Sequence, residues 1–131
     1  MIAVDSNILA YLYLPGPNTA AVEALMERDA DWVAPMLWRS EFRNVLAGYL
    51  RRGDLRFDQA LAIQSEAERL LAAAEFAVDS RAVLEAVRDS DCSAYDGEYI
   101  ALARELGVRL ATFDRRLLRT FPDVARVPGE C

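Results

Sequence analysis

The stretch Met1-Ile-Ala-Val-Asp-Ser-Asn-Ile-Leu9 opens the chain with a short apolar run that stops at an acidic residue. Such a run is typical of a buried strand, and a carboxylate directly after it lies at the edge of the sheet. We therefore expect Asp5 to mark the end of a central strand. Three other acids, Glu41, Asp96 and Asp114, lie in segments that a fold can bring beside it. Because the chain has no histidine, a site built from these acids favours a hard divalent cation.

The length of the chain, 131 residues, fits one domain spanning residues 1–131. With 53% hydrophobic and 27% charged residues, the composition is that of a globular protein. No apolar run approaches the roughly 20 residues that a membrane helix needs, and we expect no signal peptide because Asp5 interrupts the N-terminal apolar segment. We therefore expect a cytoplasmic protein without membrane contact. Cys92 and Cys131 are too few and too isolated for a disulfide framework and are expected to be reduced thiols.

The net charge of −6 argues against a protein that coats nucleic acid, which would need a basic face. It does not exclude a nuclease, because clustered catalytic acids supply part of the negative charge and a bound divalent ion reverses its sign locally. All 15 basic residues are arginine. The absence of lysine excludes every mechanism that needs a catalytic lysine.

Strands and helices are expected to alternate along the chain. Beyond the first strand, we expect strands at Trp32–Ala34, Phe76–Val78, Val108–Phe113 and, at an edge, Val124–Val127. The predicted helices run from a cap at Ser6 or Asn7 to Tyr13, from Asn18 to about Asp29, Met36–Arg51, Phe57–Ala74, Arg81–Arg88, Ala94–Leu106 and Arg115–Thr120. Because more chain separates the strands than a hairpin spans, the prediction is an α/β fold. It has a central parallel sheet of four to five short strands, helices on both faces, and a protruding helical hairpin that turns at Gly53.

The four acids are expected to meet at one edge of this sheet, since ligands of parallel sheets bind beyond the carboxyl ends of the strands. Asp5 and Asp114 each follow a strand, and either one alone fits a helix cap as well as a ligand. Glu41 and Asp96 lie in the first two turns of helices and on their apolar faces. An ionised carboxylate there is costly to bury unless it is paired or bound to a cation. The combination favours a metal site.

Other residues near the acids are expected to have structural roles. Glu98 is interpreted as a solvated side chain, although it lies close to Asp96 in the sequence. Trp38, Phe42, Tyr95 and Tyr99 are expected to be core or pocket-wall residues and not platforms for base stacking.

Four short motifs carry the acids in a fixed order and spacing. They are Val4-Asp5-Ser6-Asn7-Ile8-Leu9, Ser40-Glu41 followed by Val45-Leu46, Tyr95-Asp96 in a helix ending Ala101-Leu102-Ala103, and Ala111-Thr112-Phe113-Asp114. Together they make the chain resemble the PIN-domain ribonucleases, specifically the VapC-type toxins of bacterial toxin–antitoxin pairs, over nearly its whole length. The resemblance implies that the four acids bind Mg²⁺ or Mn²⁺ and that Asn7 and Thr112 support them. Arg116 departs from relatives that carry a further acid there, which bears on a second metal position and not on the first.

The expected function is a Mg²⁺- or Mn²⁺-dependent endoribonuclease that acts as the toxin of such a pair. A metal-activated water would hydrolyse the phosphodiester bond of RNA. Asp5 and Asp96 are expected to be direct metal ligands, with Asp114 binding directly or through water, while Glu41 orients or deprotonates the nucleophile. The alternative is a non-catalytic module on the same fold, in which the acids hold a metal or a basic peptide.

Other folds that gather aspartates at a sheet edge fit less well. A receiver domain needs a lysine, which the chain lacks. A phosphatase of the haloacid-dehalogenase type needs a second acid two residues after the first, and that position is Asn7. A dinucleotide-binding fold needs a glycine-rich first turn, and residues 5–9 contain no glycine.

The turn of the helical hairpin carries apolar residues that the core of a small domain cannot all cover, namely Leu50, Leu55, Phe57 and Leu61. Exposed apolar surface of this kind usually marks an interface. We expect a homodimer. The resemblance also implies a VapB-like antitoxin whose tail folds on binding and places an arginine against the acids.

Overall fold

A computed structural model describes all 131 residues and contains a five-stranded sheet with the strand order β3-β2-β1-β4-β5. The strands are β1 Ile2–Val4, β2 Trp32–Pro35, β3 Glu75–Phe76, β4 Leu110–Ala111 and β5 Ala125–Arg126. Every neighbouring pair is parallel. The predicted α/β class and strand number are therefore confirmed.

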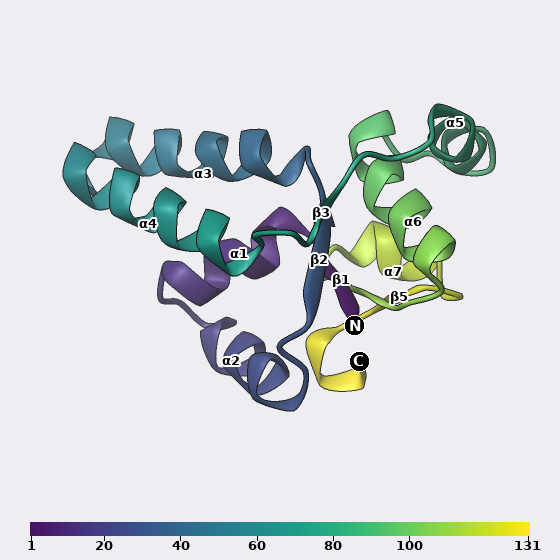
Figure 1. Cartoon of the computed structure of the whole chain (residues 1–131), viewed down its shortest axis with the longest axis horizontal. Helices are drawn as coiled ribbons and strands as arrows, with labels where there is room; N and C mark the ends of the chain where they lie inside the picture. The colour runs from purple at the N-terminus through teal and green to yellow at the C-terminus, as the bar shows by residue number, and fades with distance from the viewer.

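Helices cover both faces of this sheet (Figure 1). They are α1 Ser6–Tyr13, α2 Thr19–Arg28, α3 Trp38–Arg52, α4 Phe57–Leu70, α5 Ser80–Arg88, α6 Ala94–Leu106 and α7 Arg115–Thr120, followed by the 3₁₀ turn η1 Pro128–Glu130. The first four helices lie on one side of the sheet, and α5, α6 and α7 lie on the other. This is the three-layer arrangement that parallel strands with helical crossovers produce.

Each face of the sheet has its own apolar core, because successive side chains of a strand point to opposite faces. In β1, Ile2 and Val4 belong to the core beneath α1–α4, whereas Ala3 belongs to the core beneath α5–α7. In β2, Trp32 lies with the first group and Val33 with the second. The short N-terminal run is thus buried on both sides, as its uninterrupted apolar sequence indicates.

Several boundaries differ from the prediction. Asp5 itself caps α1, since its Oδ1 accepts a hydrogen bond from the Ile8 N–H at 3.0 Å, so the predicted cap at Ser6 or Asn7 is wrong. The second hairpin helix ends at Leu70, short of the predicted Ala74, and Ala73 takes a left-handed φ of 62° as the chain turns into β3. The alanines there favour a helix, but pairing with β2 redirects the chain.

Three strands are shorter than expected or shifted. The predicted strand Val108–Phe113 is reduced to Leu110–Ala111, the predicted Phe76–Val78 becomes Glu75–Phe76, and the predicted Val124–Val127 is reduced to Ala125–Arg126. Strand limits depend on where a neighbouring strand offers hydrogen bonds, and β4 pairs with both β1 and β5 over these two residues only.

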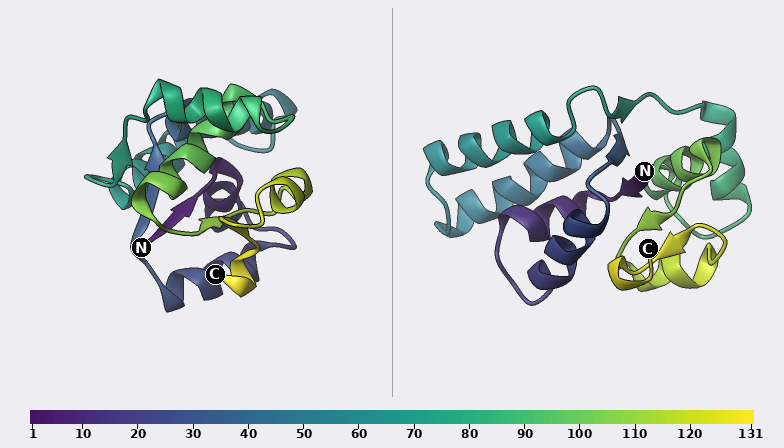
Figure 2. Two further views of the ribbon diagram at one scale, coloured as in Figure 1. Left: turned by 90° about the vertical axis from the view of Figure 1, so that its right-hand side faces the viewer. Right: turned by 60° about the horizontal axis from the view of Figure 1, so that its bottom comes forward.

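The hairpin of α3 and α4 projects from the sheet, as Figures 1 and 2 show. Gly53, in the left-handed conformation with φ of 75°, ends α3 at the tip. Leu50 and Leu55 are partly buried against the core, so only part of the expected apolar surface remains. Phe57 and Leu61 are 69% and 53% exposed.

Both cysteines, Cys92 and Cys131, are free thiols, as predicted. None of the helices combines the length and the apolar composition needed to cross a bilayer.

Candidate active site

Two of the candidate acids follow neighbouring strands of the sheet. Asp5 comes directly after β1, and Asp114 lies three residues beyond β4. The two strands pair in parallel with Val4 opposite Ala111, and the Asp5 N–H donates to the Ala111 carbonyl at 3.4 Å. Because the carboxyl ends of both strands lie at the same edge, the sheet topology brings these carboxylates together.

Thr112 links the two strand-end acids. It is fully buried, and its Oγ1 donates a hydrogen bond to Asp5 Oδ2 at 2.5 Å. The same Oγ1 accepts a hydrogen bond from the Asp114 N–H at 3.0 Å. With Ile8 donating to Oδ1, the Asp5 carboxylate is held on both oxygens by neutral donors and by no cation. The side chain expected to support the acids therefore contacts the first of them directly.

Asp5 is an acid in an unfavourable environment, with only 7% of the residue exposed. Its pKa is raised to about 6, chiefly by desolvation and also by the nearby charges of Glu41 and Asp114, against the lowering effect of the Thr112 and Ile8 hydrogen bonds. A buried carboxyl group whose pKa is raised by desolvation and by neighbouring like charges is typical of a functional site.

Glu41 reaches the site from the first turn of α3, and two side chains orient it. Its Oε1 accepts a hydrogen bond from the Tyr99 hydroxyl at 2.6 Å and one from Ser6 Oγ at 3.4 Å. Tyr99 is 2% exposed, and burial together with the Glu41 hydrogen bond raises the pKa of its hydroxyl far above the ordinary value. Glu98 is partly buried and forms no hydrogen bond or ion pair with the protein, and burial together with the charge of Glu41 raises its pKa.

Tyr99 and Ser6 are site residues that the sequence interpretation missed. Tyr99 was assigned to the core, which its burial confirms, but a buried tyrosine hydroxyl needs a hydrogen-bond partner. That requirement is the available signal, because Tyr99 lies on α6 one turn after Asp96.

Asp96 and Asp114 complete the group. Asp96 lies in the first turn of α6, and burial raises its pKa, with a further contribution from the charge of Asp114. Its Oδ2 forms an ion pair with Arg116 Nη2 at 3.3 Å. Asp114 caps α7 by accepting hydrogen bonds from the backbone N–H groups of Arg116 at 2.9 Å and Leu117 at 3.2 Å.

A cleft of about 420 Å³ adjoins Glu41. It is lined by Ser6, Asn7, Leu37, Ser40, Glu41, Asn44, Val45 and Tyr95. Asn7 is exposed there and has no hydrogen bond to another side chain. Tyr95 is 64% exposed, so it is a wall of this cleft and not part of the core. The cleft offers polar side chains and one aromatic ring beside the acids.

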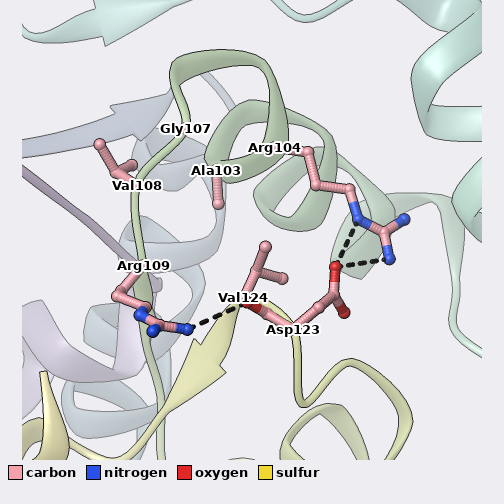
Figure 3. Close-up of a pocket in the computed structure, with 7 residues that line it drawn as sticks. All are labelled: Ala103, Arg104, Gly107, Val108, Arg109, Asp123 and Val124. Atoms are coloured by element: carbon pink, nitrogen blue, oxygen red, sulfur yellow. Dashed lines mark hydrogen bonds and ion pairs between the residues drawn. The ribbon is translucent and has the colours of Figure 1, made fainter.

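A second cavity, of about 440 Å³, lies at the end of α6 and the start of β4 (Figure 3). Arg104 forms an ion pair with Asp123 at 3.1 Å, and Arg109 donates to the Asp123 carbonyl at 3.0 Å. Since Arg109 precedes β4 and Asp114 follows it, this cavity lies at the opposite edge of the sheet from the acids.

The donor set of the site fits a hard divalent cation, although no three acidic side chains form a preformed metal-binding cluster. All candidate ligands are carboxylates, Asp5 is buried without a cationic partner, and only Arg116 pairs with any of the four acids. Mg²⁺ and Mn²⁺ prefer oxygen ligands, and Mg²⁺ keeps several waters, so a few converging carboxylates suffice.

The model that describes the PIN domain family matches residues 2–124. A curated relative, "Ribonuclease VapC3" of Pyrobaculum aerophilum, is 31% identical over 127 residues, which is 92% of this chain and 95% of the relative. The resemblance inferred from the motifs is thereby confirmed.

Two solved structures share the fold. The structure titled "Crystal Structure of FitAcB from Neisseria gonorrhoeae" aligns over 100% of both chains with a TM-score of 0.78 and 18% identity. The structure titled "Structure of FitAB bound to IR36 DNA fragment" aligns over 98% of this chain and 95% of that chain, with a TM-score of 0.74 and 19% identity.

Proposed function

The chain belongs to the PIN domain family, and on that premise we propose that it is a divalent-metal-dependent endoribonuclease and the toxin of a toxin–antitoxin pair. The observation that carries the proposal is the Asp5 carboxylate, which is buried beside Asp114 and Glu41 with no cation to offset its charge. A fold retains such an arrangement at a cost to stability, so we assign it a role in chemistry. The 31% identical relative is named a ribonuclease, which supports RNA as the substrate.

Asp5, Asp96 and Asp114 would hold Mg²⁺ or Mn²⁺. When bound, the cation lowers the pKa of a water and offsets the charge of the scissile phosphate. Glu41 is the proposed base, because Tyr99 and Ser6 fix its Oε1 while Oε2 has no hydrogen bond to the protein. That oxygen is free to accept a proton from the attacking water.

The cleft beside Glu41 is the proposed path of the RNA strand. Asn7 and Asn44 offer amide donors and acceptors. Contrary to the expectation from the sequence, the exposed ring of Tyr95 is proposed to offer a surface on which an unpaired base stacks. These contacts suit single-stranded RNA, because its unpaired bases can stack on an aromatic ring and form hydrogen bonds with amide groups. Asn7 thus keeps its proposed supporting role by touching substrate and not by touching Asp5.

We assign the antitoxin to the exposed side of the helical hairpin. A groove of about 190 Å³ there is lined by Arg43, Leu46, Ala47, Leu50, Phe57, Ala60, Leu61 and Gln64. Phe57 and Leu61 expose apolar surface beside it, which suits an amphipathic segment of a partner.

The chain is also proposed to form a homodimer. Light scattering at micromolar concentration tests the dimer, and co-purification with the protein encoded next to this chain tests the antitoxin.

The nuclease itself is tested with purified protein and a labelled single-stranded RNA in Mn²⁺. We expect cleavage by the wild type, no cleavage in a chelator, and none by Asp5→Asn. The matched control is Asp91→Asn, since Asp91 is exposed and its side chain forms no hydrogen bond or ion pair. Cleavage by Asp5→Asn at the wild-type rate contradicts the assignment of this site.

The alternative function, a non-catalytic module that holds a metal or a basic peptide, predicts a different pair of results. In both cases Mn²⁺ raises the melting temperature of the wild type, because a ligand that binds only the folded state stabilises it. Only the nuclease also cleaves RNA. A metal-dependent melting shift without cleavage under any divalent ion therefore supports the module.

A further inference from the structure

Arg116 is the single cation that pairs with any of the four site acids. Its Nη2 lies 3.3 Å from Asp96 Oδ2, and no second guanidinium nitrogen contacts that carboxylate. The Arg116 side chain is 54% exposed and that of Asp96 is 25% exposed. A single, long and solvated contact of this kind contributes little to stability and breaks easily.

The backbone of Arg116 is fixed while its side chain is free. Its N–H donates to Asp114 Oδ1 at 2.9 Å in the first turn of α7, so the residue stays beside the acids in any rotamer. The exposed guanidinium can therefore change partners without a movement of the helix. Loss of the ion pair leaves Asp96 free to bind another cation.

We propose that Arg116 is a substrate-binding residue that exchanges its Asp96 contact for a phosphate of the RNA when a divalent cation takes Asp96. The inference rests on the proposed function and names a contact for its substrate. With Asp96 bound to a divalent ion, the Arg116 guanidinium would lose its anionic partner and would be repelled by the positive charge of the ion. The next anion to enter is the phosphodiester, whose oxygens match the planar fork of arginine.

The charge of the molecule makes this residue important. The net charge is −6, and Asp96, which pairs with Arg116, also lies near the negative charge of Asp114. Arg116 places a positive charge directly beside Asp96, one of the proposed metal ligands. In the metal-free protein the same charge occupies Asp96 and competes with the incoming cation.

Arg115 provides a matched control because it precedes Arg116 in the same turn of α7. It is exposed and forms neither an ion pair nor a side-chain hydrogen bond. Replacing Arg115 or Arg116 by Gln removes the same charge from the same helix. A difference between the two variants therefore reports the contact and not the general electrostatic potential.

The first measurement is a Mn²⁺ titration of the melting temperature, without RNA, for the wild type, Arg116→Gln and Arg115→Gln. We expect Arg116→Gln to need about threefold less Mn²⁺ for half of the shift, the scale of a lost exposed ion pair, and Arg115→Gln to match the wild type. An unchanged or raised midpoint in Arg116→Gln, or an equal change in both variants, overturns the exchange.

The second measurement separates KM from kcat for a single-stranded RNA at saturating Mn²⁺. Arg116→Gln should raise KM about tenfold with kcat within about twofold, since a phosphate contact positions the substrate. Arg116→Lys should restore part of the loss because it keeps the charge without the fork. A wild-type KM in Arg116→Gln, or a fall in kcat with KM unchanged, overturns the proposal.

The two measurements also distinguish this inference from the proposed function. A wild-type protein that binds Mn²⁺ and cleaves no RNA contradicts the nuclease and with it the phosphate contact. Wild-type cleavage, together with Arg116→Gln behaving like Arg115→Gln in both assays, contradicts the exchange alone.

Discussion

Two groups of acids in this molecule have different hydrogen-bond partners, and the pKa shifts of Glu75 and Asp5 are opposite in direction. At the base of the hairpin, Glu75 accepts hydrogen bonds on both oxygens from Arg39, at 2.6 and 2.8 Å, and a third from Trp38 Nε1 at 2.8 Å. Arg39 also pairs with Glu68 at 2.9 Å. At the sheet edge, Asp5 is more deeply buried and has neutral donors only. The hydrogen bond from Arg39 lowers the pKa of Glu75, whereas desolvation raises the pKa of Asp5 to about 6.

The opposite pKa shifts indicate that the charge of Glu75 stabilises the fold, whereas the charge of Asp5 lowers its stability. Glu75 ties β3 to α3 and, through Arg39, to Glu68 on α4, so its charge helps to fix the hairpin on the sheet. Asp5 ties its surroundings together only through Thr112 and the α1 cap. We expect substitutions in the first group to change stability and those in the second to change activity.

The largest expected effect is on RNA cleavage. Asp5→Asn, Asp96→Asn and Asp114→Asn should each reduce kcat by about 1,000-fold or more, because a proposed metal ligand and its charge are lost. Glu75→Gln should retain wild-type kcat per folded molecule. Rates measured with Mn²⁺ after confirming the folded fraction by circular dichroism test both. Comparable losses in Glu75→Gln and Asp5→Asn would erase the distinction between the two groups.

The next effect is on stability. Glu75→Gln should lower the free energy of unfolding by about 3 kcal/mol, because Arg39 and the Trp38 N–H keep only one acceptor oxygen between them. Glu68→Gln is the control, since Glu68 is 34% exposed and makes one ion pair with Arg39, so its loss should cost about 1 kcal/mol or less. Urea unfolding of both variants gives the two values. Equal losses of unfolding free energy would show that the bidentate Arg39–Glu75 contact stabilises the protein no more than the single Arg39–Glu68 ion pair does.

A smaller effect should follow from removing the hydroxyl that orients Glu41. Tyr99→Phe keeps the buried ring and removes the 2.6 Å hydrogen bond, and loss of such an orienting partner should lower kcat about tenfold with KM unchanged. The control is Tyr11→Phe, because Tyr11 packs edge-on against Phe113 and its hydroxyl makes no side-chain hydrogen bond. Steady-state kinetics with single-stranded RNA decide the point. If both variants behave alike, Tyr99 is a core residue only.

The smallest expected effect is the gain in the free energy of unfolding when the charge of Asp5 is removed. A carboxyl with a folded-state pKa of about 6 against 3.8 when unfolded stabilises the protein fully below about pH 4. That contribution is lost as the pH rises through 6. The ceiling of this cost is on the order of 3 kcal/mol, and Asp5→Asn recovers only about 1 kcal/mol because the Thr112 hydroxyl loses its acceptor.

Urea unfolding of the wild type and Asp5→Asn without divalent ions, from pH 4 to pH 8, measures this difference. The variant should be the more stable protein above pH 6, and the gap should close toward pH 4. Glu75 gives the opposite slope, since its lowered pKa adds stability above the unfolded value of 4.5 that is lost at lower pH. A variant less stable than the wild type at every pH would make Asp5 a structural residue.

The sequence by itself determined the order of the elements. Helical periodicity predicted α3 and α6, and the apolar run before Asp5 predicted the central strand. As predicted, α6 begins after Ser93 and ends before Gly107. These are local features, because propensity, capping and burial pattern act over a few neighbouring residues. The parallel sheet followed from the spacing of the strands, and the neighbouring positions of Asp5 and Asp114 followed from the sheet.

Only the tertiary structure decided the partners of the acids. Thr112 meets Asp5 across 107 residues of chain, Tyr99 meets Glu41 across 58, and Arg116 meets Asp96 across 20. Such contacts depend on the angle at which helices pack and on the rotamers left open once the core is filled, which no local pattern encodes. The strand limits of β3 and β4 were misplaced for the same reason, since each depends on hydrogen bonds offered by a neighbour that the sequence does not name.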